Sequence, residues 1–276
     1  MKKMKKIMAA AIAMMTFSTA AAVTGTVAWF TASNVVSASG MSLQADTEQG
    51  INISNEAKSE WKNSATASHN GKVGENQAAF IPTTTSNATE WKHGNSNDRN
   101  SHEANATLDT LELTTSGDGI YKVSTATSSL YNKNVYLLNN FYLRSSTPMQ
   151  LTNKPLYVNS VVAERSGTAQ ELDNAFRVLV KYDTTCLIYA PFEAAVDPAT
   201  TAENGAIAPG AGSLNKLIAS SVTIPAASDS IDDDALEISV YCYYEGEDSH
   251  CKSANIVPDF NTLSVTCRFG TETVTA

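Results

Sequence analysis

The stretch AFRVLVKYDTTCLIYA, residues 175–190, decides the fold class, because it is rich in Val, Leu, Tyr and Thr and is followed by Pro191. Short β-branched and aromatic runs that end in turn residues are typical of strands. Helical periodicity is not sustained after residue 30, and AQELDNAF (169–176) is the best short helix candidate. We therefore predict an all-β chain, folded as a jelly-roll-like antiparallel β-sandwich. Further strand-like runs are SGMSLQAD (39–46), GINIS (50–54), TLDTLELTT (107–115), GIYKVST (119–125), VYLLNNFYLRSS (135–146), LYVNSVVAE (156–164), SVTIPAA (221–227), ALEISVYCYYEG (235–246) and TLSVTCRFG (262–270).

Composition excludes several classes of protein. The 276 residues carry 19 Lys and Arg against 28 Asp and Glu, which gives a formal net charge of −9. A broad basic surface for nucleic acid is therefore not expected. Only 17% of the residues are charged, and Ser, Thr, Asn and Ala are abundant, which argues against a coiled coil and suits an extracellular β-protein.

The N-terminus is typical of an export signal. Four lysines in MKKMKK precede an uncharged apolar run from Ile7 to about Phe30. We assign residues 1–28 to a signal peptide, which is either cleaved or retained as a membrane helix. The protein is then secreted or displayed at the cell surface, and it contacts the membrane through this segment alone. The chain ends in CRFGTETVTA without a wall-sorting motif.

Residues 29–276 are expected to form one β-sandwich domain with a polar, loop-rich insertion at about 55–106. The insertion is dominated by Ser, Thr, Asn, Ala and Gly and lacks apolar periodicity. Its large apolar side chains are the expected points of attachment to the domain. These are Trp61, Phe80, Ile81 and Trp91.

The four cysteines, Cys186, Cys242, Cys251 and Cys267, lie in the C-terminal third of the chain and are candidates for disulfides in an exported protein. Four cysteines allow three pairings, and the sequence does not choose between them. Cys242 with Cys251 would connect a strand end to the following loop, and Cys186 with Cys267 would connect two strands. Alternatively, some remain buried free thiols. No Cys-x-x-Cys is present and His250 is the only histidine nearby, so a zinc site is not expected.

Motifs for catalysis and cofactor binding are missing from the sequence. There is no His-Glu-x-x-His, no Gly-x-Ser-x-Gly and no phosphate-binding Gly-Lys-Ser/Thr. We therefore predict no catalytic, cofactor-binding or metal-ligating residue and no enzyme activity. Two acidic runs, SDSIDDD (228–234) and EGED (245–248), are expected to be solvated loops, with bound Ca²⁺ as a minor alternative because the EF-hand spacing is absent.

The stretch TGTVAWFTASNVVSASGMSLQA, residues 24–45, resembles the signal junction of the TasA/camelysin family of Gram-positive exported proteins. The run VYCYYEGEDSHC (240–251) resembles a strand followed by EGxDxxC in relatives of that family. The resemblance implies cleavage by a signal peptidase of the SipW type, a jelly-roll domain and a role in matrix or fibres. In fibre-forming members the N-terminal strand of one subunit completes the sheet of the next. By position, Trp29 to Ser39 would be the donor strand here, with Trp29, Phe30, Val35 and Val36 as anchors.

Three functions follow as expectations. The first is a structural protein of the cell surface or extracellular matrix (biofilm) of a Gram-positive-type bacterium, whose partners are copies of itself or other matrix subunits. The second is a surface adhesin or a module that binds glycans or a host, and exposed Trp or Tyr along a groove would favour it. The third is a camelysin-like metalloprotease. The donor segment can also stay within its own domain or serve as a tether.

Overall fold

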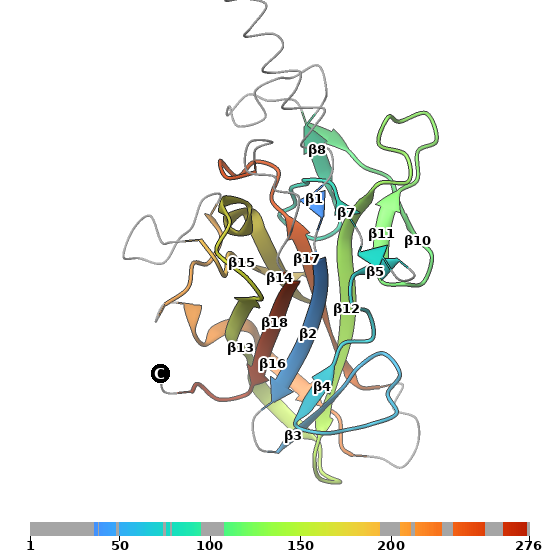
Figure 1. Cartoon of the computed structure of the whole chain (residues 1–276). Helices are drawn as coiled ribbons and strands as arrows, with labels where there is room; N and C mark the ends of the chain where they lie inside the picture. Colours follow the sequence, from blue (N-terminus) through green and yellow to red (C-terminus); the bar gives the residue numbers. More distant parts are fainter. Residues whose placement is uncertain are drawn as a thin grey trace, which may run out of the picture.

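The computed structural model describes residues 36–37, 39–47, 50–73, 76–77, 79–94, 108–193, 205–210, 213–227, 234–251 and 262–274. Strands dominate these residues, and the two largest sheets face each other across one core, which confirms the all-β prediction (Figure 1). The segment that the sequence assigns to a signal peptide lies outside the described residues. Within the described part of the chain, no helix has the length and apolar character needed to cross a membrane.

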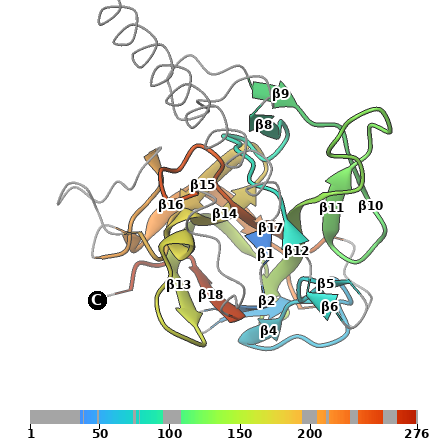
Figure 2. The same cartoon turned by 45° about the horizontal axis from the view of Figure 1, so that its top comes forward.

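The first sheet has nine strands built around β12 and β17, which pair antiparallel from Leu137–Cys242 to Leu143–Leu236. β17 pairs on its other side with β14, and β14 pairs with β15 at the edge. Figure 2 shows β10 and β11 to one side of β12. The strands of this sheet are β1 (Val36–Ser37), β3 (Ile51–Ser54), β7 (Ala79–Phe80), β10 (Leu113–Thr115), β11 (Ile120–Val123), β12 (Asn134–Ser145), β14 (Phe176–Tyr182), β15 (Thr185–Tyr189) and β17 (Leu236–Tyr244).

The second sheet has five strands in the order β16-β13-β18-β2-β4. β2 and β18 run parallel, and so do β7 and β12 at their single pair, so the sandwich that we predicted as antiparallel also contains parallel pairs. Periodicity gives the same inward and outward pattern for either direction, so the sequence could not reveal this. The strands of this sheet are β2 (Ser39–Thr47), β4 (Ser64–Thr66), β13 (Leu151–Arg165), β16 (Lys216–Ile224) and β18 (Thr262–Gly270).

Side chains that alternate along the strands fill the space between the two sheets. In β14, Phe176, Val178 and Val180 point into the main core, where they meet residues of the second sheet such as Val265 and Phe269. The main core buries more than twenty apolar side chains in this way, and their burial is the principal favourable term for the fold. The intervening residues of β14 face the opposite side of the sheet.

That opposite side carries a second apolar layer. Trp91 lies against three tyrosines of β12 and β17, with ring centroids 4.2 Å from Tyr136, 6.0 Å from Tyr241 and 5.0 Å from Tyr243. All four rings are buried. This aromatic cluster attaches residues 79–94 to the outer face of the nine-stranded sheet.

The insertion is attached more firmly than its composition suggests. Phe80, Ile81 and Trp91 are buried, as expected of attachment points, and Trp61 is partly buried with Arg144 stacked 4.3 Å from its ring. Several short strands form within it. They include β4 and β7 above, β5 (Lys72–Val73) with β6 (Asn76–Gln77), and β8 (Lys92–Gly94), which pairs with β9 (Leu108–Thr110) just after the insertion.

The predicted short helix is one 3₁₀ segment, η1 (Glu171–Ala175). Asp173 accepts a hydrogen bond from the backbone N–H of Gln170, and Arg165 pairs with the same carboxylate at 2.9 Å. η1 leads directly into β14. It thereby places the start of β14 beside the loop that follows β17, where the backbone N–H of Glu245 donates to the carbonyl of Ala175.

Candidate functional site

The loop after β17, with the sequence EGEDSHC (245–251), folds back on itself through a series of turns. The backbone N–H of Asp248 donates to the carbonyl of Glu245, and that of Cys251 donates to the carbonyl of Asp248. At Gly246 a Cβ atom would lie 3.2 Å from the backbone of Pro82, so glycine allows the loop to approach residues 82–83 closely. This geometry turns Glu245, Asp248 and Cys251 inward, and all three are buried. The prediction that EGED is a solvated loop is therefore wrong for Glu245 and Asp248.

Arg177 neutralises two buried carboxylates at this end of the sandwich. Its Nη2 donates to Oε2 of Glu193 at 2.7 Å and to Oδ2 of Asp248. Its Nη1 donates to the carbonyls of Asn174 at 2.6 Å and Phe176 at 3.2 Å. All three charged side chains are buried. Charges can be buried in this way when they are paired and fully hydrogen-bonded.

His250 extends this charge cluster to the surface. Its Nδ1 lies 2.9 Å from Oδ1 of Asp248, which also accepts the backbone N–H of His250 at 2.7 Å. Its Nε2 lies 3.8 Å from Oε2 of Glu171 on η1. The cluster therefore joins η1, β14, the segment after β15 and the loop after β17.

Glu193, Asp248 and His250 offer three ligand atoms within 4.8 Å of one another. Two carboxylates and an imidazole form a donor set that zinc and related ions accept. Here, however, the guanidinium of Arg177 already bonds to both carboxylates, and a metal ion would have to displace it. The arrangement serves as an arginine-centred charge cluster, and the absence of a metal site remains a prediction.

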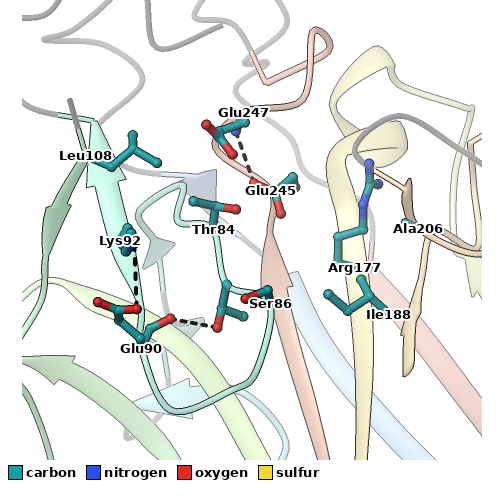
Figure 3. A pocket seen from close by; sticks show the side chains of 11 residues that line it. Thr84, Ser86, Glu90, Lys92, Leu108, Arg177, Ile188, Ala206, Glu245 and Glu247 are labelled. Carbon is teal, nitrogen blue, oxygen red and sulfur yellow. Dashed lines mark hydrogen bonds and ion pairs between the residues drawn. The ribbon is translucent and has the colours of Figure 1, made fainter. Parts of the chain in front are cut away.

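A pocket of about 340 Å³ lies beside the cluster, on the outer face of the nine-stranded sheet (Figure 3). Arg177 and Ile188, from β14 and β15, form one side of it, and Glu245 lies at the end of β17. The segment around Thr84 and Lys92 forms the opposite side. The complete lining comprises Thr84, Thr85, Ser86, Glu90, Lys92, Leu108, Arg177, Ile188, Ala206, Glu245 and Glu247.

Glu245 is the most perturbed acid in this pocket. Burial raises its pKa from the ordinary 4.5 to about 7, although hydrogen bonds from the backbone of Glu247 and the side chain of Thr84 and the charge of Arg177 act in the opposite direction. Tyr243 lies opposite Arg177 in the sheet, its side chain is buried, and its pKa is raised by burial and by the charge of Glu245. A carboxylate desolvated in a pocket is a recurrent property of binding and catalytic sites.

Of the four predicted donor-strand anchors, the structure describes Val36 alone, and Trp29, Phe30 and Val35 lie outside the described residues. Val36 and Ser37 form β1, which pairs with β7 of the same chain. Val36 thus adds to its own nine-stranded sheet, and this short pairing consists of two residue pairs.

All four cysteines carry free thiols in the structure. Cys242, Cys251 and Cys267 lie in the main core, and burial raises the pKa of Cys242 to about 12. Cys186 packs instead against the aromatic cluster on the outer face. Because the sheet separates these two layers, a bridge between Cys186 and Cys267 would require the sheet to rearrange. A bridge between Cys242 and Cys251 remains a prediction.

Sequence reasoning missed Arg177, Glu193 and Glu245 as members of a site. The available signal was weak: Arg177 is the single charge in FRVLV, at a position that alternation directs away from the core. The other acidic run, 228–234, lies outside the described residues apart from Asp234. Its expected solvation, and the minor alternative of bound Ca²⁺, remain predictions.

A second hollow of the surface lies beside the edge strand β16. A groove of about 490 Å³ lies between the β14–β15 turn and β16. Among the described residues, β16 pairs with β13 alone, so its outer edge has no partner strand there. The groove is lined by Tyr182, Asp183, Thr185, Leu217, Ile218, Ala219, Ser220 and Ser221.

No protein-family model, no curated protein and no solved structure matches this chain. The fold and the site define a mostly β protein with two facing sheets and a buried, arginine-centred charge cluster beside a polar pocket. The resemblance of residues 24–45 to the TasA/camelysin family remains a prediction.

Proposed function

We propose that this protein is a non-enzymatic structural subunit of the cell surface or extracellular matrix, with a jelly-roll-like sandwich that associates with copies of itself by strand addition. The observation that supports this function best is the open edge of β16. An exposed strand edge presents unpaired N–H and C=O groups and readily accepts another strand. The groove beside β16 gives an added strand room for its side chains.

The sequence of β16 carries little of the charge that usually protects an edge strand, although its pairing with β13 contains three register shifts. Proteins commonly block such edges with charges, proline or bulges that turn the edge away. In KLIASSVTI the only charge is Lys216 at its start, and Pro225 comes directly after its end. Ser220 and Ser221 are exposed, and Leu217 is 48% exposed. From Leu217 to Ile224 the strand carries no charge that would oppose pairing with a second copy.

In this proposal the donor is the N-terminal segment from Trp29 to Ser39. Cleavage of the export signal would free this segment, and an uncleaved signal would hold it at the membrane. Two of its residues, Val36 and Ser37, pair with β7 in the same chain. Two pairs cost little to exchange for a longer strand pairing, because the ladder bonds lost are remade in the new sheet. The protein would act outside the cell, and its partners would be itself or other matrix subunits.

The alternatives have less support among the described residues. A glycan-binding platform usually displays aromatic rings, yet Trp91, Tyr136 and Tyr241 are buried, and Tyr131 is the one aromatic among the exposed large apolar side chains described. A metalloprotease would need its ligands open to a metal ion, and Arg177 already bonds to the carboxylates that come closest to such a set.

The test is concentration-dependent assembly of the mature protein, followed by sedimentation velocity and electron microscopy. Ser220→Lys combined with Ser221→Lys places two charges on β16 and is expected to abolish assembly. Thr127→Lys combined with Ser129→Lys adds the same two charges at exposed positions between β11 and β12 and is the matched control. A wild-type protein that stays monomeric at every concentration, or a β16 variant that assembles normally, would overturn the proposal.

A further inference from the structure

The pocket beside the charge cluster is lined by a buried acidic group, Glu245. Within the described part of the chain, no lysine or arginine forms an ion pair with Glu245, whose side chain is almost completely buried. The side chain of Thr84 lies beside its carboxylate (Figure 3). A desolvated carboxylate favours a cationic partner, which would restore the interactions lost with water.

The two cations of the lining are already committed to other acids. Arg177 bonds to Glu193 and Asp248 through Nη2, and Nζ of Lys92 lies 3.6 Å from Oε2 of Glu90. An anionic ligand would therefore find no uncommitted positive group on the described lining. The potential at Glu245 favours a cation instead.

A smaller part of the lining is apolar and can contact an alkyl stem. Ile188, Ala206 and Leu108 supply apolar surface within the same pocket, and Ile188 and Ala206 lie across from Glu245 in Figure 3. A volume of about 340 Å³ is within the range of pockets that bind small molecules.

We propose that this pocket binds a primary alkylammonium group, whose ammonium pairs with Glu245 and Thr84 and whose methylene stem packs on Ile188 and Ala206. The ligand is either a free alkyl amine or the lysine side chain of a peptide. An ammonium offers three donors, and a charge-assisted hydrogen bond to a buried carboxylate is strong. This function is independent of the open edge of β16, which lies at a different groove.

The experiment is isothermal titration calorimetry of the mature protein at pH 8 with three probes. These are 1,5-diaminopentane, Nα-acetyl-lysine N-methylamide and Nα-acetyl-norleucine N-methylamide. Norleucine keeps the stem but lacks the ammonium. We expect one or both amines to bind and norleucine to bind at least about tenfold more weakly. Binding of the diamine alone identifies a free amine as the ligand, and binding of the lysine derivative identifies a peptide.

The variants separate this site from a general effect of charge. Glu245→Gln keeps the shape of the side chain and is expected to reduce affinity at least about tenfold, whereas Glu60→Gln, at an exposed position outside the pocket, is expected to leave it unchanged. Thermal unfolding confirms that Glu245→Gln is folded. Ala206→Leu places a larger side chain where the methylene stem would pack, and it is expected to reduce affinity independently of Glu245. Failure of both amines to bind, equal binding of norleucine, or unchanged affinity in Glu245→Gln would overturn the proposal.

The pH dependence gives a further readout. A ligand amine stays protonated below its ordinary pKa near 10, so binding changes with the ionisation of Glu245. The groups that surround this carboxyl are Arg177 on β14, Thr84 on the segment opposite, and Tyr243 and Glu247 on its own side. Because protonation removes its charge, we expect affinity to fall from pH 8 to pH 5.5. Affinity that is constant over this range would contradict a role for the Glu245 carboxylate.

Discussion

Replacing Glu245 by Gln is expected to stabilise the fold at neutral and higher pH. The carboxyl has a pKa of about 7 in the native state, against an ordinary value of 4.5 that we assign to the unfolded chain. Below pH 4.5 both states hold the proton, so the group has no effect there. Between pH 4.5 and 7 the unfolded chain ionises first, and the free energy of unfolding falls by up to about 1.4 kcal/mol per pH unit.

The loss is complete above pH 7, where it reaches about 3 kcal/mol. Glutamine has no proton to release, so Glu245→Gln should be more stable than the wild type by up to this amount at pH 8 and nearly equal to it at pH 4.5. Urea unfolding followed by tryptophan fluorescence from pH 4.5 to 8 measures both curves. Glu60→Gln, at a fully exposed site, should run parallel to the wild type. Parallel curves for Glu245→Gln, or lower stability at pH 8, would refute the reasoning.

Other predictions concern the charge cluster and the packing. Arg177→Met should lower the free energy of unfolding by about 3–5 kcal/mol in urea titrations, because two buried carboxylates lose their cation. Trp91→Ala should cost about 3–5 kcal/mol and remove most of the near-UV circular dichroism of the aromatic cluster. Gly119→Ala should lower the melting temperature, since its Cβ would lie 2.5 Å from the ring of His69 at a φ of +71°. Alkylation of the denatured, unreduced protein should always label Cys186, and a Cys186–Cys267 bridge found by mass spectrometry would contradict the separation of the two layers.

The strands were predictable because their side chains alternate. The runs at 135–146, 175–190 and 235–246 correspond to β12, to β14 with β15, and to β17, and their inward residues form the main core. Pairing partners were not predictable. The parallel contact of β2 with β18 joins segments more than 200 residues apart, and nothing in either run encodes strand direction.

The site was hidden because its residues are ordinary when taken singly. Glu193 and Asp248 meet at Arg177 only after β14, β15 and β17 have paired, and each looks like a surface charge in the sequence. Composition predicted a polar insertion at about 55–106. It did not reveal how the insertion is attached, because only three of its apolar residues, Ile81, Ala88 and Trp91, are buried in the cluster on the outer face of the sheet.

The position of Glu245 also bears on why the pocket exists. Its carboxylate is desolvated, lies in an otherwise paired set of charges and weakens the fold above its pKa, whereas glutamine would keep the shape of the side chain without that cost. Residues that break a local rule without a structural gain are concentrated at functional sites. In the same loop, Asp248 is also buried, but its carboxylate is paired with Arg177, which bonds to Glu193 as well. Asp248 forms an ion pair with Arg177, whereas Glu245 forms no ion pair with a described lysine or arginine, and this contrast is the strongest internal argument that a cation from outside the described chain completes the pocket.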